Sequence, residues 1–383
     1  MKSTRTGHRW AAVMVAAMLT TLVAAIAAPA QTYSVVYSFA GGTGGSSPWA
    51  GLIADGAGNL YGTTQRGGSY GFGTVFKLDP EGNETVLYSF AGGADGTVPQ
   101  AGLIRDNAGN LYGDTANGGI FDGGTVFKLD STGHETVLYA FAGRDGMYPE
   151  GSLTQDAVGN LYGTTERGGL AGLGVVFKLD TLGNETVLHS FNWTNGAGPF
   201  GGPIRDAVGD FYGIASGGGL HGYGVVFKLD PAGNESTLYN FPGGADGANP
   251  EAALIRDAVG NLYGTTAFGG VGVGVVFELD AADSETVLHS FKNNGLDGTN
   301  PAASLVRDAT GNLYGTTANG GTENAGTVFA VGSDGSEKLL YSFSGGTDGA
   351  YPQAGLLPYE GALYGTTSAG GAGYGVIYKI TLH

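Results

Sequence analysis

The sequence predicts an all-β fold, a seven-bladed β-propeller, from a long repeat, four β-prone segments per repeat and complementary chain ends. The pentapeptide LYGTT, or a close variant, recurs at steps of 50 or 51 residues, with its tyrosine at Tyr61, Tyr112, Tyr162, Tyr212, Tyr263, Tyr314 and Tyr364. A period of this length indicates supersecondary units that bury a core only by packing against one another.

Residues 102–141 illustrate one repeat. Short β-prone segments at 103–106 and 110–115, and again at 125–130 and 135–141, are separated by glycine-containing turns, so each pair is predicted to form an antiparallel hairpin. No segment has a helical apolar period. Stacking such four-stranded sheets radially buries both faces of every sheet. A parallel β-solenoid is the alternative, although its coils are usually shorter than this repeat.

The two ends of the repeat region favour the propeller. Residues 32–39 match the fourth segment of a repeat, and residues 375–382 match the third. Together they complete one sheet, which gives six continuous blades and a seventh closed by the N-terminal strand pairing in the last blade. An open solenoid does not need this arrangement.

Residues 1–30 differ from the repeats and are predicted to be a signal peptide. Lys2, Arg5 and Arg9 precede an apolar run that ends in Ala28-Pro29-Ala30, the order of a secretory signal with its cleavage site. An uncleaved membrane anchor is the alternative, because the run is long enough to span a bilayer. We expect residues 31–383 to form a single propeller domain that is secreted or extracytoplasmic, in the periplasm or at the cell surface.

Composition limits the classes of partner. The chain has no cysteine, so packing rather than disulfides must stabilise it. Without the three basic residues of the signal, 14 lysines and arginines face 34 aspartates and glutamates. Such a charge disfavours nucleic acid and anionic membranes. We expect a monomer with no membrane span after signal cleavage.

The repeats resemble a known family. Copies such as GNLYGTTERGGLAGLGVVFKLDTLGNETVLHSF, at 159–191, are similar to the Gloeo/Verruco (GloVer) tandem repeat family of exported bacterial proteins, and the similarity covers essentially the whole chain after residue 30. The resemblance implies export and a repeat architecture. It implies no catalytic residue and no cofactor.

Loop length distinguishes the two faces of the predicted propeller. The turns at 106–109 and 130–134 are short and define the short-turn face, whereas the connections at 116–124 and 91–101 are longer and define the long-loop face. Rigid scaffolds tend to carry function on larger loops. The long-loop face is therefore the candidate binding face, with a purely structural role of its glycine-rich loops as the alternative.

Two tryptophans are candidate ligand contacts. Trp193 lies where the repeat is most disrupted, at 191–216, and Trp49 marks a smaller departure in the first loop. An exposed indole suits stacking on a sugar ring. Sequence drift in a tolerant repeat is the alternative.

Two recurrent charged positions are weaker candidates. Calcium would suit the Asp-Gly aspartates, with Asx-turn stabilisation as the simpler alternative; they are Asp95, Asp145, Asp246, Asp297 and Asp348. An anionic ligand would suit the first-strand arginines if they crown the channel, with solvated or locally paired side chains as the alternative; they are Arg105, Arg205, Arg256 and Arg307.

The sequence therefore predicts an exported binding or scaffold module, with a glycan or a cell-surface protein as ligand. The alternative is a propeller enzyme, a hydrolase or lyase acting on polysaccharide, and a passive envelope repeat is a third option. No H-E-x-x-H or G-x-S-x-G motif occurs, and the GGxxGxG strings join strands rather than open a helix, so they do not indicate a phosphate site. We name no catalytic residue, expect no cofactor, and consider an enzyme the less favoured reading.

Overall fold

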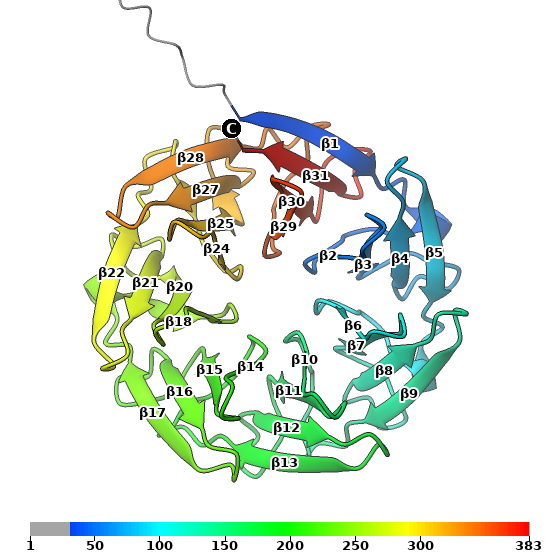
Figure 1. Cartoon of the computed structure of the whole chain (residues 1–383), viewed down its shortest axis with the longest axis horizontal. Coiled ribbons are helices and arrows are strands. Elements are labelled where there is room, and N and C mark those ends of the chain that lie inside the picture. Colours follow the sequence, from blue (N-terminus) through cyan, green and yellow to red (C-terminus); the bar gives the residue numbers. More distant parts are fainter. Residues whose placement is uncertain (1–30, 383) are drawn as a thin grey trace, which may run out of the picture. The chain divides into compact units, whose positions relative to one another are not determined.

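The computed structural model describes residues 31–382, which form seven antiparallel blades arranged radially around a central channel (Figure 1). The predicted signal peptide, residues 1–30, lies outside the described residues. Within residues 31–382 no helix is long and apolar enough to cross a membrane, since the helical segments are three short 3-10 turns, at Gly42–Gly44, Gly93–Asp95 and Gly244–Asp246. The seven-bladed propeller predicted from the repeat is confirmed.

Each blade has a two- or three-residue strand next to the channel and a longer strand at the outside, with strand bounds that recur from blade to blade. Blades 1 to 3 comprise β2 (Ile53–Ala54), β3 (Leu60–Thr64), β4 (Thr74–Leu78) and β5 (Glu84–Ser89); β6 (Ile104–Arg105), β7 (Leu111–Thr115), β8 (Thr125–Leu129) and β9 (Glu135–Ala140); and β10 (Thr154–Gln155), β11 (Leu161–Thr165), β12 (Val175–Leu179) and β13 (Glu185–Ser190). Blades 4 and 5 comprise β14 (Ile204–Arg205), β15 (Phe211–Ala215), β16 (Val225–Leu229) and β17 (Glu235–Asn240); and β19 (Ile255–Arg256), β20 (Leu262–Phe268), β21 (Val275–Leu279) and β22 (Glu285–Ser290). Blades 6 and 7 comprise β24 (Val306–Arg307), β25 (Leu313–Thr317), β27 (Thr327–Val331) and β28 (Glu337–Ser342); and β29 (Leu357–Tyr359), β30 (Ala362–Thr367), β31 (Val376–Thr381) and β1 (Thr32–Ser38).

The seventh blade joins the two ends of the repeat region, as the sequence predicts. β1 pairs antiparallel with β31, from Thr32 opposite Thr381 to Ser38 opposite Val376. The chain then leaves β1 through Phe39, whose ring packs edge-on against Phe76 of blade 1 at 5.2 Å. The first strand therefore closes blade 7 and also joins it to blade 1.

The core lies between blades. A phenylalanine after each outer strand is fully buried and packs edge-to-face on an aromatic ring in the third strand of the next blade, as Phe90 does on Phe127 at 5.2 Å. The LYGTT tyrosine joins the same interface, because Tyr61 packs with Leu103 and Leu111 of blade 2. Apolar surface buried in this way supplies the main driving force for assembly of the ring.

The loops of the long-loop face are braced against each other. Isolated bridges join each inter-blade loop to the loop between the second and third strands, as at Thr97 with Asn117 and Met147 with Arg167. In blades 5 and 6 this contact lengthens into short strands that the sequence does not predict, namely β18 (Ala248–Pro250), β23 (Gly298–Thr299) and β26 (Asn319–Gly320). The long-loop face is thus a rigid platform despite its glycine content.

Candidate functional site

The candidate site is a ring of seven side chains at the channel mouth on the long-loop face. Each inter-blade loop carries a buried proline just before the innermost strand, and the residue after that proline lines the mouth. The seven residues, called here the channel-mouth ring, are Trp49, Gln100, Glu150, Phe200, Glu251, Ala302 and Gln353. The proline before this position and the two small residues after it vary little between blades, whereas the ring position carries aromatic, acidic, amide and methyl side chains.

The prolines fix the backbone that presents the ring. Pro149 packs against Gly124 of blade 2 so closely that a Cβ added to Gly124 would lie 2.6 Å from the proline Cδ. The residue before each ring proline has a left-handed backbone, at φ values such as +59° for Val98 and Tyr148. Of the ten non-glycine residues with positive φ in the described chain, six stand at this position. Strain that recurs in this way is typical of functional sites held by a rigid scaffold.

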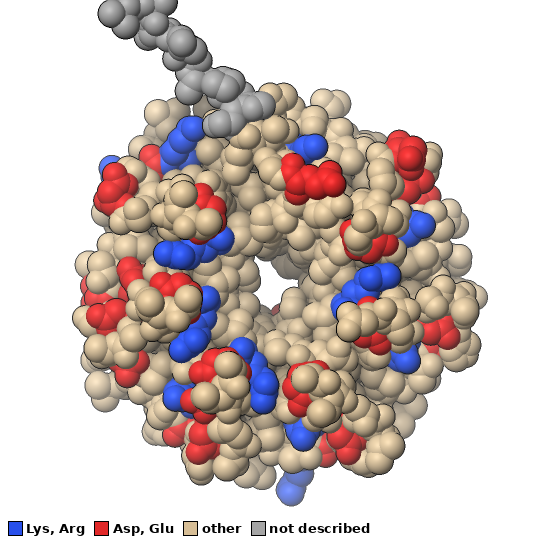
Figure 2. Space-filling view, viewed as in Figure 1, with Lys and Arg blue, Asp and Glu red and all other residues tan. Residues whose placement is uncertain are grey.

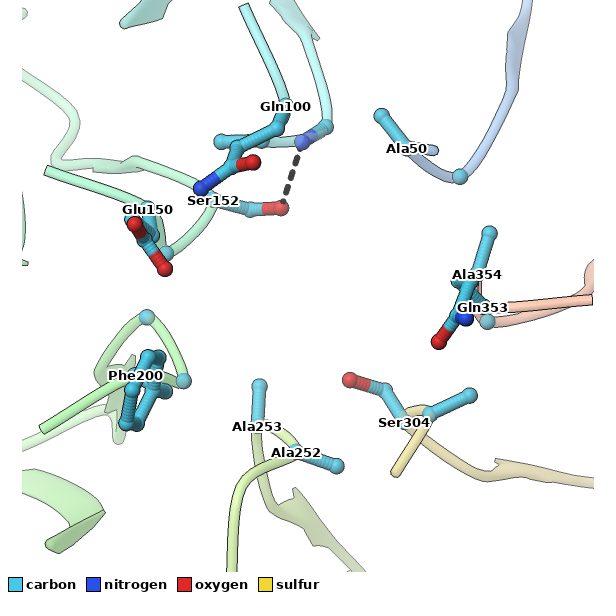
Figure 3. Close-up of a pocket in the computed structure, with 18 of the residues that line it drawn as sticks. Ala50, Gln100, Glu150, Ser152, Phe200, Ala252, Ala253, Ser304, Gln353 and Ala354 are labelled. Carbon is cyan, nitrogen blue, oxygen red and sulfur yellow. Dashed lines mark hydrogen bonds between the residues drawn. The ribbon is translucent and has the colours of Figure 1, made fainter. Parts of the chain in front are cut away.

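The ring surrounds a cavity of about 280 Å³. Small residues follow each ring residue, and Figure 3 shows Ser152 and Ser304 among them, together with Glu150 and Phe200. The backbone N–H of Gly102 donates to Ser152 Oγ at 3.1 Å, which ties blade 2 to blade 3 at the cavity wall. Aromatic faces, carboxylates, amides and hydroxyls therefore converge on one concave surface, the composition typical of small-ligand sites.

The acidic side of the ring has perturbed carboxyl groups. Burial, and next the negative charge of Glu166, raise the pKa of Glu150 to about 7. Burial also raises the pKa of Glu251. Glu150 can therefore hold a proton near neutral pH and donate it in a hydrogen bond inside the cavity.

A second carboxyl group lies behind the cavity wall beside Glu150. Asp114 is 1% exposed and neither carboxyl oxygen has a hydrogen-bond partner. Burial, and next the charge of Glu150, raise the pKa of Asp114 well above its ordinary value. Asp114 replaces the first threonine of LYGTT, which in five other blades donates to a carbonyl of the next blade, as Thr316 does to Ala354 at 3.1 Å. Burial at this position therefore favours the protonated over the charged form of Asp114.

The structure separates the two predicted tryptophans. Trp49 belongs to the channel-mouth ring and is 38% exposed. Trp193 is 57% exposed and stands three residues beyond β13, the outermost strand of blade 3, where its carbonyl accepts from Gly219 N–H. Phe200, from the same irregular loop as Trp193, is the residue that reaches the ring.

The predicted arginines end innermost strands at the opposite mouth. Their guanidinium groups lie over aromatic rings, as Arg105 does over Tyr61 of blade 1 at 5.9 Å and Arg256 over Tyr212 at 5.3 Å. Figure 2 shows basic side chains around the channel on the face in view. Among residues 31–382 none of the four is within ion-pair distance of a carboxylate; they are Arg105, Arg205, Arg256 and Arg307.

The Asp-Gly aspartates lie far from both mouths, at the outer seams between blades. Asp95 accepts from the backbone N–H of Ala91 at 2.8 Å and from the Tyr88 hydroxyl at 2.9 Å, an Asx-type turn contact. Each loop by itself contributes one acidic residue. The packing of adjacent blades places a second beside it: burial, and then the charge of Asp95, raise the pKa of Glu135, at the start of the next outer strand, to about 7. The same pairing recurs for Asp145 with Glu185.

Sequence reasoning misses most of the channel-mouth ring, as well as Asp114 and the seam glutamates. An available signal is the proline present in all seven copies, followed by a residue whose chemistry changes from copy to copy. That signal becomes a site only when ring closure places seven distant loops together.

Comparisons with known proteins agree with the fold. The Gloeobacter/Verrucomicrobia repeat family matches the chain over residues 21–177 and 153–378. No curated protein matches the chain. Among solved structures, virginiamycin B lyase from Staphylococcus aureus superposes with a TM-score of 0.61 at 12% identity, over 92% of this chain and 99% of that one.

A second solved structure is the extracellular domain of a hybrid two-component system protein from Bacteroides thetaiotaomicron. It has a TM-score of 0.61 at 12% identity, and the match covers 91% of this chain but 39% of that one. At such identities the likeness concerns the propeller fold alone.

Proposed function

We propose that the protein, which belongs to the Gloeobacter/Verrucomicrobia repeat family, is an exported binding module whose channel-mouth ring holds a glycan. One observation carries the proposal: the residue after each ring proline differs between blades, and the seven together place side chains of mixed chemistry around one cavity. Residues that only close a propeller need not differ between blades. A ligand without sevenfold symmetry requires such differences.

The aromatic members of the ring support a sugar as ligand. Trp49 and Phe200 line the same cavity, and an aromatic face packs well on the apolar face of a pyranose. Amide and carboxyl groups beside them, at Gln100, Glu150 and Gln353, suit the hydroxyls of a sugar. The acidic members favour a neutral or cationic glycan over an anionic one.

A glycan array probed with the purified protein tests this proposal. We expect binding to a limited set of neutral or amino-sugar glycans, and Trp49→Ala or Phe200→Ala to weaken it about tenfold each, a loss of ~1.4 kcal/mol. Trp193→Ala is the matched control, because Trp193 is exposed outside the ring. A silent array, or equal losses in all three variants, would contradict the proposal.

A second candidate function, a propeller hydrolase or lyase, is favoured by one specific observation. Glu150 faces the cavity with its pKa raised to about 7, and behind it burial, and next the charge of Glu150, raise the pKa of Asp114. A carboxyl group whose pKa lies near neutrality is typical of general acid–base catalysis.

Release of reducing or unsaturated sugar from any bound polysaccharide distinguishes the enzyme from the binding module. If the chain is an enzyme, Glu150→Gln should lower turnover at least a hundredfold with less effect on affinity. Asp114→Thr, which restores the common residue of the repeat, should lower it as well. Binding without release of product would leave the binding module as the function.

A further inference from the structure

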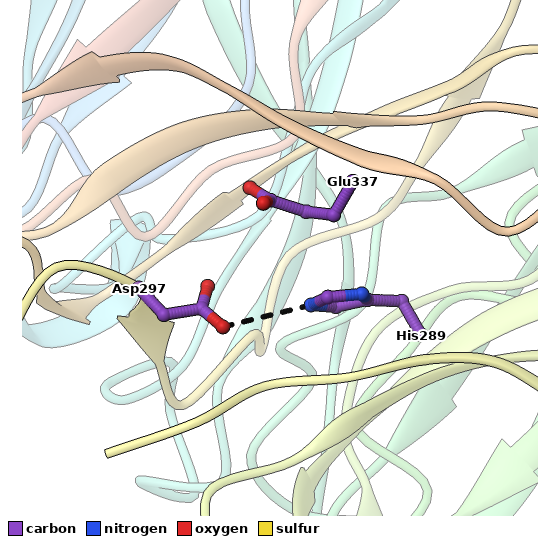
Figure 4. A group of neighbouring side chains, drawn as sticks. All are labelled: His289, Asp297 and Glu337. Atoms are coloured by element: carbon purple, nitrogen blue, oxygen red, sulfur yellow. Dashed lines mark ion pairs between the residues drawn. The ribbon is translucent and has the colours of Figure 1, made fainter. Parts of the chain in front are cut away.

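The seam between blades 5 and 6 carries a set of side chains that no other seam reproduces. At three of the seven seams the outer strand contributes a tyrosine, the following loop an aspartate and the next outer strand a glutamate, as in Tyr139, Asp145 and Glu185. At the seam of blades 5 and 6 the tyrosine is replaced by His289 from β22, beside Asp297 and Glu337 (Figure 4). One nitrogen and two carboxylate oxygens of these residues lie within 4.8 Å of one another.

The imidazole faces the carboxylates without a hydrogen bond. His289 Nε2 is 3.7 Å from Asp297 Oδ2, and this nitrogen is buried without a hydrogen-bond partner in residues 31–382. The His289 and Asp297 side chains are only 13% and 9% exposed. Two buried carboxylates beside an imidazole nitrogen at this distance call for a positive charge, either a proton on the imidazole, which makes the ion pair drawn in Figure 4, or a cation bound between the three groups.

Other contacts hold two of the three side chains, His289 and Asp297, in place. The His289 ring packs edge-to-face on Phe291 at 4.8 Å. Asp297 accepts from the backbone N–H of Lys292 at 3.0 Å through Oδ2, and from that of Gly298 at 2.8 Å through Oδ1. Such surrounding contacts orient ligands at metal sites.

We propose that His289, Asp297 and Glu337 form a site for a divalent transition-metal ion, with Zn²⁺ as the probe, that links blade 5 to blade 6. Three atoms within 4.8 Å of one another share a point no more than about 2.8 Å from each, so shifts of under about 1 Å bring them to Zn–N and Zn–O lengths of ~2.0–2.2 Å. An imidazole with two carboxylates favours such an ion over Ca²⁺, which takes oxygen ligands. Water would complete a tetrahedral shell.

The chain provides its own control. At the seam of blades 3 and 4, His189 again replaces the tyrosine, but Asn195 stands in place of the aspartate. There His189 Nε2 is 2.9 Å from Asn195 Nδ2, so the imidazole has a neutral partner, and Glu235 is the one acid. The two seams differ mainly by one carboxylate.

Isothermal titration of the chelator-treated protein with Zn²⁺, with Ca²⁺ in parallel, tests the site. We expect one equivalent of Zn²⁺ to bind and to raise the melting temperature, and His189→Tyr to retain this binding. His289→Tyr installs the tyrosine of other seams, and Asp297→Asn recreates the set at blades 3 and 4; each should weaken Zn²⁺ binding at least tenfold. Absence of Zn²⁺ binding, stabilisation by Ca²⁺ alone, or unchanged affinity in the folded His289→Tyr and Asp297→Asn variants would overturn the proposal.

Discussion

The residue before each ring proline adopts a left-handed backbone conformation whatever its side chain. Val98 holds φ at +59°, although a β-branched side chain disfavours this region more than most. Asn249, Asn300 and Tyr351 occupy the matching place in other blades with similar φ values. The propeller loops therefore impose this backbone conformation, and its energetic cost differs with the residue at the position.

Val98→Asn should stabilise the protein by about 1 kcal/mol, because asparagine adopts the left-handed region at lower cost than valine. Urea denaturation of the variant beside the parent measures this difference. The backbone N–H of Val98, which donates to the Phe72 carbonyl at 3.1 Å, is retained in the variant. A lower denaturation midpoint for Val98→Asn would mean that packing of the valine outweighs its backbone strain.

Gly124→Ala should destabilise the protein by about 3 kcal/mol or more, because overpacking adds to the cost of a left-handed backbone. Its Cβ would lie 2.4 Å from the Thr115 carbonyl oxygen and 2.6 Å from Pro149 Cδ, at φ +91°. Gly71→Ala is the matched control, with φ +88° and no atom within 4 Å of its Cβ, and should cost about 1 kcal/mol. Equal losses would show that the contact with Pro149 is unimportant.

At the scale of elements, outer strands of adjacent blades bring acids together at their seams. Three glutamates each begin an outer strand and lie beside the Asp-Gly aspartate of the loop that leaves the outer strand of the previous blade. The pairs are Glu135 with Asp95, Glu185 with Asp145, and Glu285 with Asp246. Burial, and then that aspartate, raise the pKa of each glutamate from 4.5 to about 7. The seams are thus the main pH-sensitive contacts between blades.

The melting temperature should fall as pH rises from about 5 to 8. With raised pKa values, the folded protein keeps protons on Glu135, Glu185 and Glu285 at pH values where the unfolded chain has released them, so the free energy of unfolding decreases across this window. The triple variant with glutamine at these three positions should melt a few degrees higher at pH 8 and nearly unchanged at pH 5. A parent whose melting temperature rises over this range would contradict the assignment.

The strands could be predicted from the sequence, whereas much of the site could not. β-prone segments such as 125–130 are local signals, and the structure places β8 at Thr125–Leu129. The channel-mouth ring and the seam acids depend on contacts between residues of different blades, which lie far apart in the sequence. Glu150 beside Asp114, or His289 beside Glu337, becomes a neighbour only through the stacking of blades. The exposed-tryptophan signal in the sequence selects Trp49, which lies in the channel-mouth ring, and equally Trp193, which lies outside it.

At the scale of the whole molecule, one strand closes the ring. β1 supplies the outer edge of blade 7, and Phe39 behind it is fully buried against blade 1. No other single strand of residues 31–382 joins segments so distant in the sequence, since Thr32 pairs with Thr381.

Deleting residues 32–39 should destabilise the whole propeller, since blade 7 loses its outer strand and blade 1 loses its packing partner. Phe39→Ala is a milder variant that should cost about 3–5 kcal/mol, and Val35→Thr, at a 39% exposed position of the same strand, should change stability by less than about 0.5 kcal/mol. Calorimetry of the three variants measures these effects. An unchanged melting curve after the deletion would show that closure contributes little.

The pairing of β1 with β31 also sets an order of events during synthesis. The ribosome makes β1 more than 300 residues before its partner, and at 5–20 residues per second the wait is about 20–70 s. Throughout that time β1 presents an open edge that can pair with other chains. A chain that ends before β31 lacks the pairing partner of β1, so it cannot complete blade 7.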